Sequence, residues 1–345
     1  MPSPHRLLRS VRIIGTGMTR LNPPPSANGS HATPSQLMQQ SLGLALDSVG
    51  LCVRDLDGLI AIPSLAEPHF MEAHFLATQI GMLPGRSLVV RTVDTGGAGP
   101  VTGLLEAKRM VQMEGADLVA VVAGDAVKNL PSHEFLRRAD QTCSHPGANL
   151  VSPVIPSGYD RMAQYQMHRF GITREQLAMC STLMSIMASR HPYALTKKPR
   201  TIRDVMESTV VAPVTNALEC ARRADGGAAV LVASSRFLER KGLSRNMGAV
   251  IIGGGEASGP FIRLAIRYET FRPQDIFPVN THGGLLAFGA PWEVPAMYNI
   301  IEAFAQLTNT AGSQRQVRDA RRALVYGNGG IFSHSAIAIL GNGNY

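Results

Sequence analysis

The stretch VDTGGAGPVTGLLEAKRMV, residues 93–111, places three closely spaced glycines and a proline between an apolar, strand-like run and a helical pattern. Glycine permits a sharp bend, and proline fits the first turn of a helix because an N–H there would have no helical partner. The stretch contains no serine, cysteine or histidine. It therefore predicts a tight strand-to-helix turn that offers no nucleophilic side chain.

Short apolar runs alternate with helical patterns on both sides of this turn. Thr33 or Ser35 caps one expected helix, with Pro34 in its first turn. Expected strands cover residues 11–17, 56–63, 87–93 and 117–124, and expected helices cover 33–51, 71–83 and 100–114. Strands separated by such helices predict βαβ units in a largely parallel sheet that is covered on both faces. The predicted fold class is α/β.

The middle of the chain has a different pattern. A polar, proline-containing segment, 128–158, precedes two helical patterns that are separated at Gly171, the second of them capped by Thr173. We expect an inserted helical loop domain over residues 128–209. The run DGGAAVLVASS, 225–235, then predicts a strand that returns to the first sheet as an edge strand.

A second series of strand-like and helical runs follows Arg245. Expected strands cover 247–255, 261–271, 276–280, 322–330 and 335–343, and an expected helix covers 293–308. Strand, glycine turn, helix and strand thus occur at 87–124 and again at 276–330, which predicts two similar α/β halves. The domains are 1–127 plus 210–240, the loop domain 128–209, and 246–345. The second half is short between Gly255 and Asn280, so we expect at least one covering helix to be missing.

Composition limits the classes of function. Charged residues make up 17% of the 345 residues, fewer than the roughly 25% of an average domain, which favours an oligomer. The net charge is +8, but the basic residues are scattered and aromatic residues are only 6%. No basic stripe with interleaved stacking rings is present, which disfavours nucleic acid. The basic clusters are either a solvated surface or a site for a phosphate-bearing cofactor.

The cysteines and the hydropathy exclude further classes. Cys52, Cys143, Cys180 and Cys220 lie far apart, without a Cys-x-x-Cys pair or a histidine at ligand spacing. Neither a metal site nor a disulfide framework is indicated. No run of eighteen apolar residues occurs, so no membrane span is expected. We expect a cytoplasmic protein, or a mitochondrial one if the source is eukaryotic.

Five stretches in this order resemble the thiolase superfamily, in particular the sterol-carrier-type thiolases. In that family a strand leads into Cys-Ala-Ser-Gly, where this chain has Gly97-Ala98-Gly99-Pro100. The other stretches are YDRMAQYQMHRFGITREQLA with DGGAAVLV (159–178 and 225–232), YETF (268–271), NTHGGLLAFGAP (280–291) and YGNGG (326–330). The resemblance implies the layered αβαβα thiolase-like fold with a shortened C-terminal half.

The positions that carry thiolase chemistry differ in this chain. The resemblance places the nucleophilic cysteine at Gly97, or at Ala98 with a shift of one residue, the histidine at Ala290 and the second cysteine at Gly327. None of these residues can form a thioester or move a proton. The resemblance still implies that backbone N–H groups at residues 97–99, at the positive end of a helix, hold a thioester carbonyl oxygen.

Candidate site residues follow from these motifs. His282 and His334 are either acid/base groups or satisfied turn residues, and Tyr268, Tyr298 and Tyr326 are either proton donors to an enolate or core residues. The turns expected to form the pocket contribute Gly97, Ala98, Gly99, Asn280, Gly283, Gly284, Ala290, Gly327, Gly329 and Gly330. The family binds CoA phosphates beside the loop domain, where this chain has Lys197, Lys198, Arg200, Arg222 and Arg223.

Three functions remain open. The first is a protein that handles acyl-CoA thioesters without a cysteine nucleophile, similar to steroid side-chain aldolases, which cleave β-hydroxyacyl-CoA with an OB-fold partner protein. The second is a non-catalytic acyl-CoA-binding scaffold of the same fold. The third is a genuine acyltransferase, which the glycine at position 97 disfavours. The ligand in each case is a CoA thioester rather than a tightly bound cofactor, and we expect a homodimer.

Overall fold

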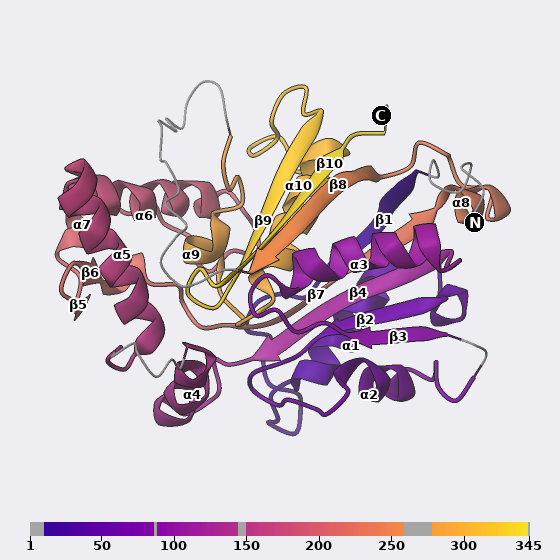
Figure 1. Ribbon diagram of the computed structural model, residues 1–345, viewed down its shortest axis with the longest axis horizontal. Helices are drawn as coiled ribbons and strands as arrows, with labels where there is room; N and C mark the ends of the chain where they lie inside the picture. Colours follow the sequence, from indigo (N-terminus) through magenta and orange to yellow (C-terminus); the bar gives the residue numbers. More distant parts are fainter. Residues whose placement is uncertain (1–9, 86–87, 144–149, 259–277, 344–345) are drawn as a thin grey trace.

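Eight of the described strands form one mixed sheet, to which β1 and β10 both belong (Figure 1). The computed structural model describes residues 10–85, 88–143, 150–258 and 278–343. The strand order is β3-β2-β4-β7-β1-β8-β10-β9. The strands are β1 (Val11–Met18), β2 (Gly58–Ile62), β3 (Val89–Thr92), β4 (Leu118–Ala126), β7 (Asp225–Ser234), β8 (Ala249–Ser258), β9 (Arg322–Gly329) and β10 (His334–Gly341).

The sheet has an internal symmetry that matches the predicted duplication. Strands β4-β7-β1 and β9-β10-β8 have the same arrangement, and the two sets meet where β1 pairs with β8. This junction consists of the antiparallel pairs Arg12 with Val250 and Ile13 with Ala249. The two halves therefore share one continuous sheet. Tyr268 and the YETF stretch lie outside the described residues, as does the expected strand 261–271.

Two expectations about the sheet were wrong. Only β2 with β3 and β2 with β4 are parallel pairs among the described strands, and β7 is antiparallel to both of its neighbours. The returning strand β7 is also not an edge strand, because it lies between β4 and β1. All ten of its residues are buried. Its continuous run of small and apolar residues is typical of a strand that is covered on both faces.

Helices cover the two faces of the first half of the sheet (Figure 1). On one face lie α1 (Pro34–Asp47), which Thr33 begins with a reciprocal capping box to Gln36, and α2 (Glu72–Gln79). On the other face lie α3 (Gly99–Met113) and α10 (Pro295–Leu307). Both α3 and α10 also pack against β9 and β10, so the bent sheet encloses them from two sides. The short helix α8 (Ser235–Arg240) follows β7.

A helical excursion separates β4 from β7. It contains α4 (Ser132–Ala139), η3 (Asp140–Cys143), α5 (Val154–Phe170), α6 (Arg174–Ser189), α7 (Ile202–Met206), a two-stranded sheet of β5 (Val210–Ala212) and β6 (Thr215–Asn216), and η4 (Ala217–Glu219). Gly171 ends α5 with a φ of 66°, and Thr173 caps α6, as the sequence predicts. Elsewhere, η2 (Val53–Asp55) precedes β2, and α9 (Gly284–Phe288) precedes α10.

The second half of the sheet is less covered than the first. Leu324 on β9 is 59% exposed, and Ile337 and Ile339 on β10 are each 38% exposed. No described strand pairs with the free edge of β9, whereas β2 pairs with its counterpart β4. This agrees with the shortened second half predicted from the sequence. Within the described ranges, no helix combines the length and the apolar character needed to cross a membrane.

Candidate functional site

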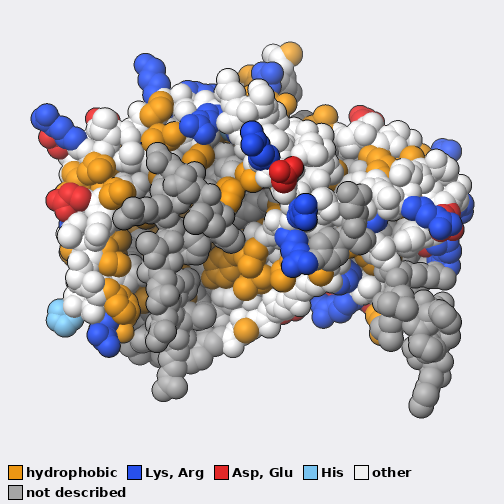
Figure 2. All heavy atoms as spheres, turned by 90° about the horizontal axis from the view of Figure 1, so that it is seen from above, with side chains coloured by type: hydrophobic (Ala, Val, Ile, Leu, Met, Phe, Trp, Pro, Cys, Tyr) orange, Lys and Arg blue, Asp and Glu red, His pale blue; other side chains and the backbone are white. Residues whose placement is uncertain are grey.

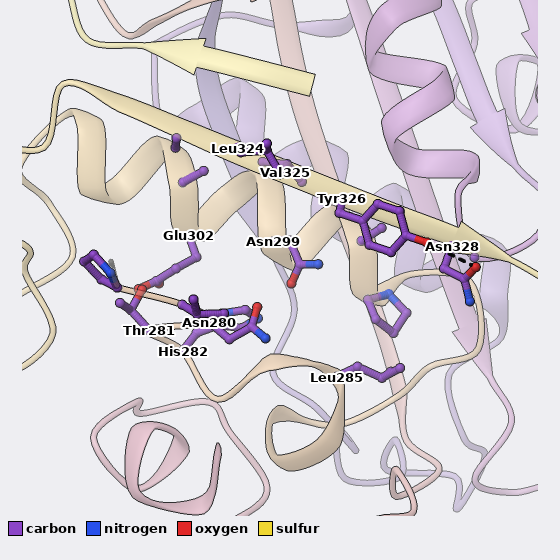
Figure 3. Close-up of a pocket in the computed structure, with 18 of the residues that line it drawn as sticks. Asn280, Thr281, His282, Leu285, Asn299, Glu302, Leu324, Val325, Tyr326 and Asn328 are labelled. Atoms are coloured by element: carbon purple, nitrogen blue, oxygen red, sulfur yellow. Dashed lines mark hydrogen bonds between the residues drawn. The ribbon is translucent and has the colours of Figure 1, made fainter. Parts of the chain in front are cut away.

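A cleft of about 840 Å³ runs along β9 and reaches the glycine turn, which we define as residues 95–99. Its walls come from α5, from residues 278–285, from α10 and from β9, and Gly97 lies at its margin (Figure 3). Most of the lining is apolar, with Phe170, Val279 and Leu285 among the exposed side chains. A mostly apolar hollow with a few polar groups is the usual form of a small-molecule site.

The glycine turn packs directly against the second glycine turn, residues 327–330. A Cβ atom on Gly97 would lie 2.5 Å from the carbonyl oxygen of Asn328, and one on Gly327 would lie 2.9 Å from the Cα of Ala98. A real Cβ atom does not approach a non-bonded atom this closely, so neither position accepts a side chain without backbone movement. The contact brings together two segments that the sequence analysis placed in one pocket.

This packing determines what the turn can offer a ligand. Ala98 is fully buried and begins α3, and Pro100 occupies the first turn of that helix. The N-terminal end of a helix carries a partial positive charge and amide donors. The Gly99 N–H already donates to the Gly96 carbonyl over 2.7 Å, and Gly97 is the residue of the turn that lines the cleft. The turn therefore offers the backbone of Gly97 rather than a serine or cysteine nucleophile.

Replacing Gly97 with valine tests this close packing. We expect Gly97→Val to lower the free energy of unfolding by about 2 to 3 kcal/mol, because the new side chain overlaps the Asn328 carbonyl and must displace the second glycine turn. Urea denaturation measures the loss. Gly43→Ala in α1 is the control, since nothing lies within 4 Å of the added Cβ, and it should gain roughly 0.5 to 1 kcal/mol. Unchanged stability of Gly97→Val would contradict the described contact.

His282 lies in the wall of the cleft and is 3% exposed. Its ring centre is 5.2 Å from that of Phe288, and its Nδ1 has no hydrogen-bond partner among the described residues. Burial lowers the pKa of His282 to about 4, and the charge of Arg315 acts in the same direction, whereas that of Glu302 opposes it. The imidazole is therefore neutral at neutral pH.

A buried polar network holds the same wall in place. The Thr281 hydroxyl donates to Glu302 Oε1 over 2.7 Å, and the Gln306 amide donates to the same oxygen over 2.9 Å. Arg315 Nη2 lies 3.3 Å from Glu302 Oε2, and both side chains are less than 10% exposed. Asn299, one turn before Glu302 on α10, points into the cleft (Figure 3). A hydrogen bond between its side chain and His282 raises the pKa of that histidine, against the effect of burial.

The end of the cleft near the glycine turn carries phenol and amide groups. The Tyr326 hydroxyl lies 3.1 Å from the Ser335 hydroxyl, and the Asn328 amide donates to the Tyr159 hydroxyl over 2.5 Å. Figure 3 shows Tyr326 and Asn328 side by side on β9. Tyr326 therefore lies where a phenol could reach a ligand.

Tyr298 lies elsewhere. It is 2% exposed, and its hydroxyl lies 2.6 Å from the position that a Cβ of Gly226 would take. Burial raises its pKa, and its hydroxyl has no hydrogen-bond partner among the described residues. It is not one of the described residues that line the cleft. Its catalytic role remains a prediction, and this placement does not favour it.

The Asn-Thr-His-Gly-Gly turn, residues 280–284, packs closely against α6. Asn280 has a φ of 49° and accepts a hydrogen bond from the Gly283 N–H over 2.8 Å. Gly283 has a φ of 104°, and a Cβ on it would overlap Ala188 of α6. Gly284 follows with a φ of 58°. This backbone brings Asn280 and His282 to the cleft.

Ala290 lies beside the strand that leads into β7 rather than among the residues lining the cleft. Its N–H donates to the Arg222 carbonyl over 2.9 Å, and its carbonyl accepts from the Ala224 N–H over 3.2 Å. The nearby Glu293 was not singled out from the sequence. Burial, and then the charges of Asp94 and Asp125, raise the pKa of Glu293 to about 8. Its carboxyl group is therefore mostly protonated at neutral pH.

The basic candidates make mainly structural contacts. The Lys197 ammonium donates to the Pro192 carbonyl over 2.6 Å, Arg200 donates to the Leu218 carbonyl over 3.2 Å, and the Arg223 guanidinium lies 4.7 Å from the Phe135 ring centre. Lys198 and Arg222 are exposed. Figure 2 shows lysine and arginine side chains scattered over one face rather than gathered. Phosphate binding by these residues remains a prediction.

The remaining two predicted residues, Gly330 and His334, lie at the bend between β9 and β10. Gly330 has a φ of 60° and forms part of the bend between β9 and β10. His334 begins β10 opposite Gly329 and contacts Ser258 and Glu256. No group of three or more histidine, cysteine or acidic residues able to hold a metal was found in the described ranges.

Comparison with known proteins identifies the fold. Residues 257–342 match the family described as thiolase C-terminal domain-like. The solved structure of the Ltp2-ChsH2(DUF35) aldolase superposes with a TM-score of 0.72 at 20% identity, covering 97% of this chain and 98% of that one. The protein has the thiolase fold. The α/β fold class predicted from the sequence is thereby confirmed, and the match to the C-terminal family supports placement in the thiolase superfamily.

Two further proteins of related name are similar to this chain. The Acat5 thiolase from Ascaris suum, solved in complex with coenzyme A, has a TM-score of 0.72 at 13% identity and covers 96% of this chain and 100% of that one. An acetyl-CoA acetyltransferase of Methanothermobacter thermautotrophicus is 26% identical over 241 residues, which are 54% of this chain. The chain covers 63% of that relative's length.

Within the thiolase fold, the structure adds residues that the motifs missed. Asn299, Glu302 and Gln306 lie on α10 at spacings of three and four residues, in a helix that is otherwise mostly apolar. A polar stripe of this kind predicts one face directed to a cleft or a polar partner. That signal was present in the sequence. Arg315 carried no such signal, because it reaches Glu302 from a segment outside the helices and strands.

Proposed function

We propose that the cleft binds an acyl-CoA thioester and that no cysteine takes part. One observation carries the proposal: Gly97 stands where the thiolase resemblance places the nucleophile, and the carbonyl of Asn328 leaves no space there for a side chain. No cysteine is found among the described residues that line the cleft. The apolar walls suit an acyl chain, and the CoA complex of the Ascaris suum thiolase supports CoA as the carrier.

The reaction that we propose is retro-aldol cleavage of a β-hydroxyacyl-CoA. The base removes the proton from the β-hydroxyl group, the bond between the α and β carbons breaks, and an aldehyde or ketone leaves. The electron pair of that bond forms a thioester enolate, which takes a proton at the α carbon to give a shorter acyl-CoA. The aldolase name of one structural neighbour supports this choice.

Each step has a candidate group in the cleft. The Gly97 amide, near the start of α3, holds the enolate oxygen. His282 is neutral and accepts the hydroxyl proton, while Asn299 Oδ1 orients that hydroxyl group. Tyr326 donates a proton to the α carbon, and it replaces Tyr298 as the phenol of choice because it lines the cleft.

A non-catalytic acyl-CoA-binding protein is the second candidate. The observation that favours it is the pKa of His282, which at about 4 is well below neutral and makes the imidazole a weak base. A cysteine-dependent acyltransferase is the weakest candidate, although the archaeal relative carries that name. Cys52 and Cys180 are exposed and do not line the cleft among the described residues.

Ligand titration separates the candidates. The protein is mixed with CoA, acetyl-CoA and a β-hydroxyacyl-CoA while its thermal unfolding and the release of aldehyde or ketone are followed. A rise in melting temperature with product release supports the aldolase, and a rise without product supports the binding protein. No rise with any of the three would contradict acyl-CoA binding. The proposed homodimer and OB-fold partner are tested separately, by size-exclusion chromatography with and without a DUF35 protein.

Replacing Tyr326 with phenylalanine tests the proposed acid. We expect Tyr326→Phe to lower the rate of carbonyl release by about 100-fold, because general acid catalysis contributes this much, while CoA binding is kept. The rate is measured with saturating β-hydroxyacyl-CoA. Tyr193→Phe is the control, since Tyr193 is exposed and does not line the cleft among the described residues. Equal rates for Tyr326→Phe and the wild type would remove Tyr326 from the mechanism.

A further inference from the structure

A hydroxyl, an imidazole and a carboxylate lie close together on one face of the β8–β10 pair. Ser258 and His334 are direct partners in the antiparallel register, and Glu256 lies two residues before Ser258 on β8. Side chains two residues apart on a strand point to the same face of a sheet. The pairing therefore places His334 between a hydroxyl and a carboxylate, although the three residues are far apart in sequence.

The distances join these side chains into a chain of contacts. The Ser258 hydroxyl lies 2.7 Å from His334 Nδ1, and His334 Nε2 lies 3.6 Å from Glu256 Oε2. Ser258 is exposed, whereas the Nε2 atom of His334 is buried without a hydrogen-bond partner in the described part of the chain. The Ser258 hydroxyl is thus open to solvent and the imidazole is mostly shielded, whereas the Glu256 side chain is 31% exposed.

A further pair of hydroxyl groups holds the carboxylate. The Thr102 hydroxyl donates to Glu256 Oε2 over 2.8 Å, and the Thr95 hydroxyl lies 3.2 Å from that of Thr102. Thr102 is in the first turns of α3 and Thr95 begins the glycine turn. Glu256 is therefore fixed on the side of the imidazole opposite to Ser258.

We propose that Ser258, His334 and Glu256 form a nucleophilic triad that hydrolyses small activated acyl esters and thioesters. Serine is activated when an adjacent imidazole can take its proton and a third group orients the imidazole. Here Ser258 is the nucleophile, His334 the base and Glu256 the positioning residue. The ring presents Nδ1 to the serine, the reverse of the common orientation, and the Glu256 contact shortens when the imidazole becomes charged.

Hydrolysis at this site proceeds in two stages through an acyl-serine. The Ser258 proton moves to His334 Nδ1 as the oxygen attacks the acyl carbonyl carbon. The bond to the leaving alcohol or thiol breaks, the leaving group takes that proton, and the acyl group remains on Ser258. Water then attacks the acyl-serine through the same base, which releases a carboxylic acid and restores the serine. This activity does not depend on the proposed carbon–carbon cleavage, because its products are a free acid and a free thiol rather than an aldehyde or ketone.

The test uses the full chain with p-nitrophenyl acetate, acetyl-CoA and a fluorophosphonate probe. We expect release of nitrophenol and of the CoA thiol, and a probe adduct that peptide mass spectrometry locates on Ser258. Ser258→Ala should lower the hydrolysis rate by at least about 100-fold, as should His334→Ala. Ser189→Ala, a serine of α6 that bonds to the carbonyl of Ile186, is the matched control and should keep the full rate.

Glu256 is tested for positioning rather than for direct contact with substrate. Glu256→Gln should lower the hydrolysis rate about 10-fold, and Glu256→Asp should restore part of it, because only the latter keeps the charge. Absence of hydrolysis by the wild type, an adduct at another residue, or full activity of Ser258→Ala would overturn the proposal. The adduct position is read from the unaltered protein, so it does not depend on the folding of any variant. The hydrolysis rates and the adduct position are independent of aldehyde or ketone release in the cleft.

Discussion

Arg315→Met is expected to lower the free energy of unfolding by about 3 to 5 kcal/mol. Arg315 is the positive partner of Glu302, and both side chains are less than 10% exposed. Removing one member of a buried ion pair leaves the other as an uncompensated charge, and this cost exceeds the value of the pair itself. Thr281 and Gln306 still donate to Glu302, which places the expected loss at the lower end of the range. Urea denaturation at pH 7 measures it.

A double variant is the control for this prediction. Arg315→Met combined with Glu302→Gln removes both charges, and glutamine keeps the shape of Glu302, so its stability should return to within about 1 to 2 kcal/mol of the wild type. Glu302 and Thr281 also form the wall of the cleft, so Arg315→Met should weaken acyl-CoA binding as well. The prediction fails if the double variant is no more stable than Arg315→Met alone.

Acidification is expected to destabilise the protein through His282. Its folded-state pKa is lowered to about 4 by burial, whereas an unfolded histidine titrates near 6.5. Below pH 6.5 the unfolded chain binds a proton that the folded chain does not bind, so the free energy of unfolding falls as the pH falls towards 4. The total loss is about 3 kcal/mol at 1.4 kcal/mol for each unit of pKa.

Comparison with His282→Asn isolates this contribution. Other groups titrate in the same range, among them His191, whose pKa burial lowers to about 3, and Asp125, whose pKa burial raises to about 6. Their effects cancel in the difference between the wild type and His282→Asn, except for the part of the His191 shift that the charge of His282 causes. Between pH 7.5 and pH 4, the free energy of unfolding of the wild type should fall by about 3 kcal/mol more than that of His282→Asn. A constant difference over this interval would show that His282 titrates normally.

Local patterns predicted the elements of the first half well. The capping box of Thr33 and the position of Pro34 began α1 as expected, and the glycine turn led from β3 into α3. These features depend on residues close together in the sequence. The order and direction of the strands depend on contacts between distant residues, and there the prediction failed: β7 is central and antiparallel. A buried apolar strand has the same composition whether it lies at the edge or in the centre of the sheet.

The candidate site was predicted in part for the same reason. The turns at Gly97, Asn280 and Gly327 contribute to one cleft. Asn280 has a positive φ, and Gly97 and Gly327 leave no space for a side chain. Tyr298 and Tyr326 looked equally suitable in the sequence. The helical phase of α10 buries Tyr298 against Gly226, and the position of Tyr326 on β9 directs it to the cleft. Side-chain direction thus separated two residues of the same type.

The absence of a nucleophile in the glycine turn could be read directly from residues 93–111, because it depends only on which side chains are present. Why no side chain fits at Gly97 became clear only in the folded chain, where the carbonyl of Asn328 occupies that space. The Ser258, His334 and Glu256 group likewise exists only because the register of β8 and β10 pairs residues 76 positions apart. Local sequence determines the backbone and the chemical groups, whereas long-range pairing decides which groups meet.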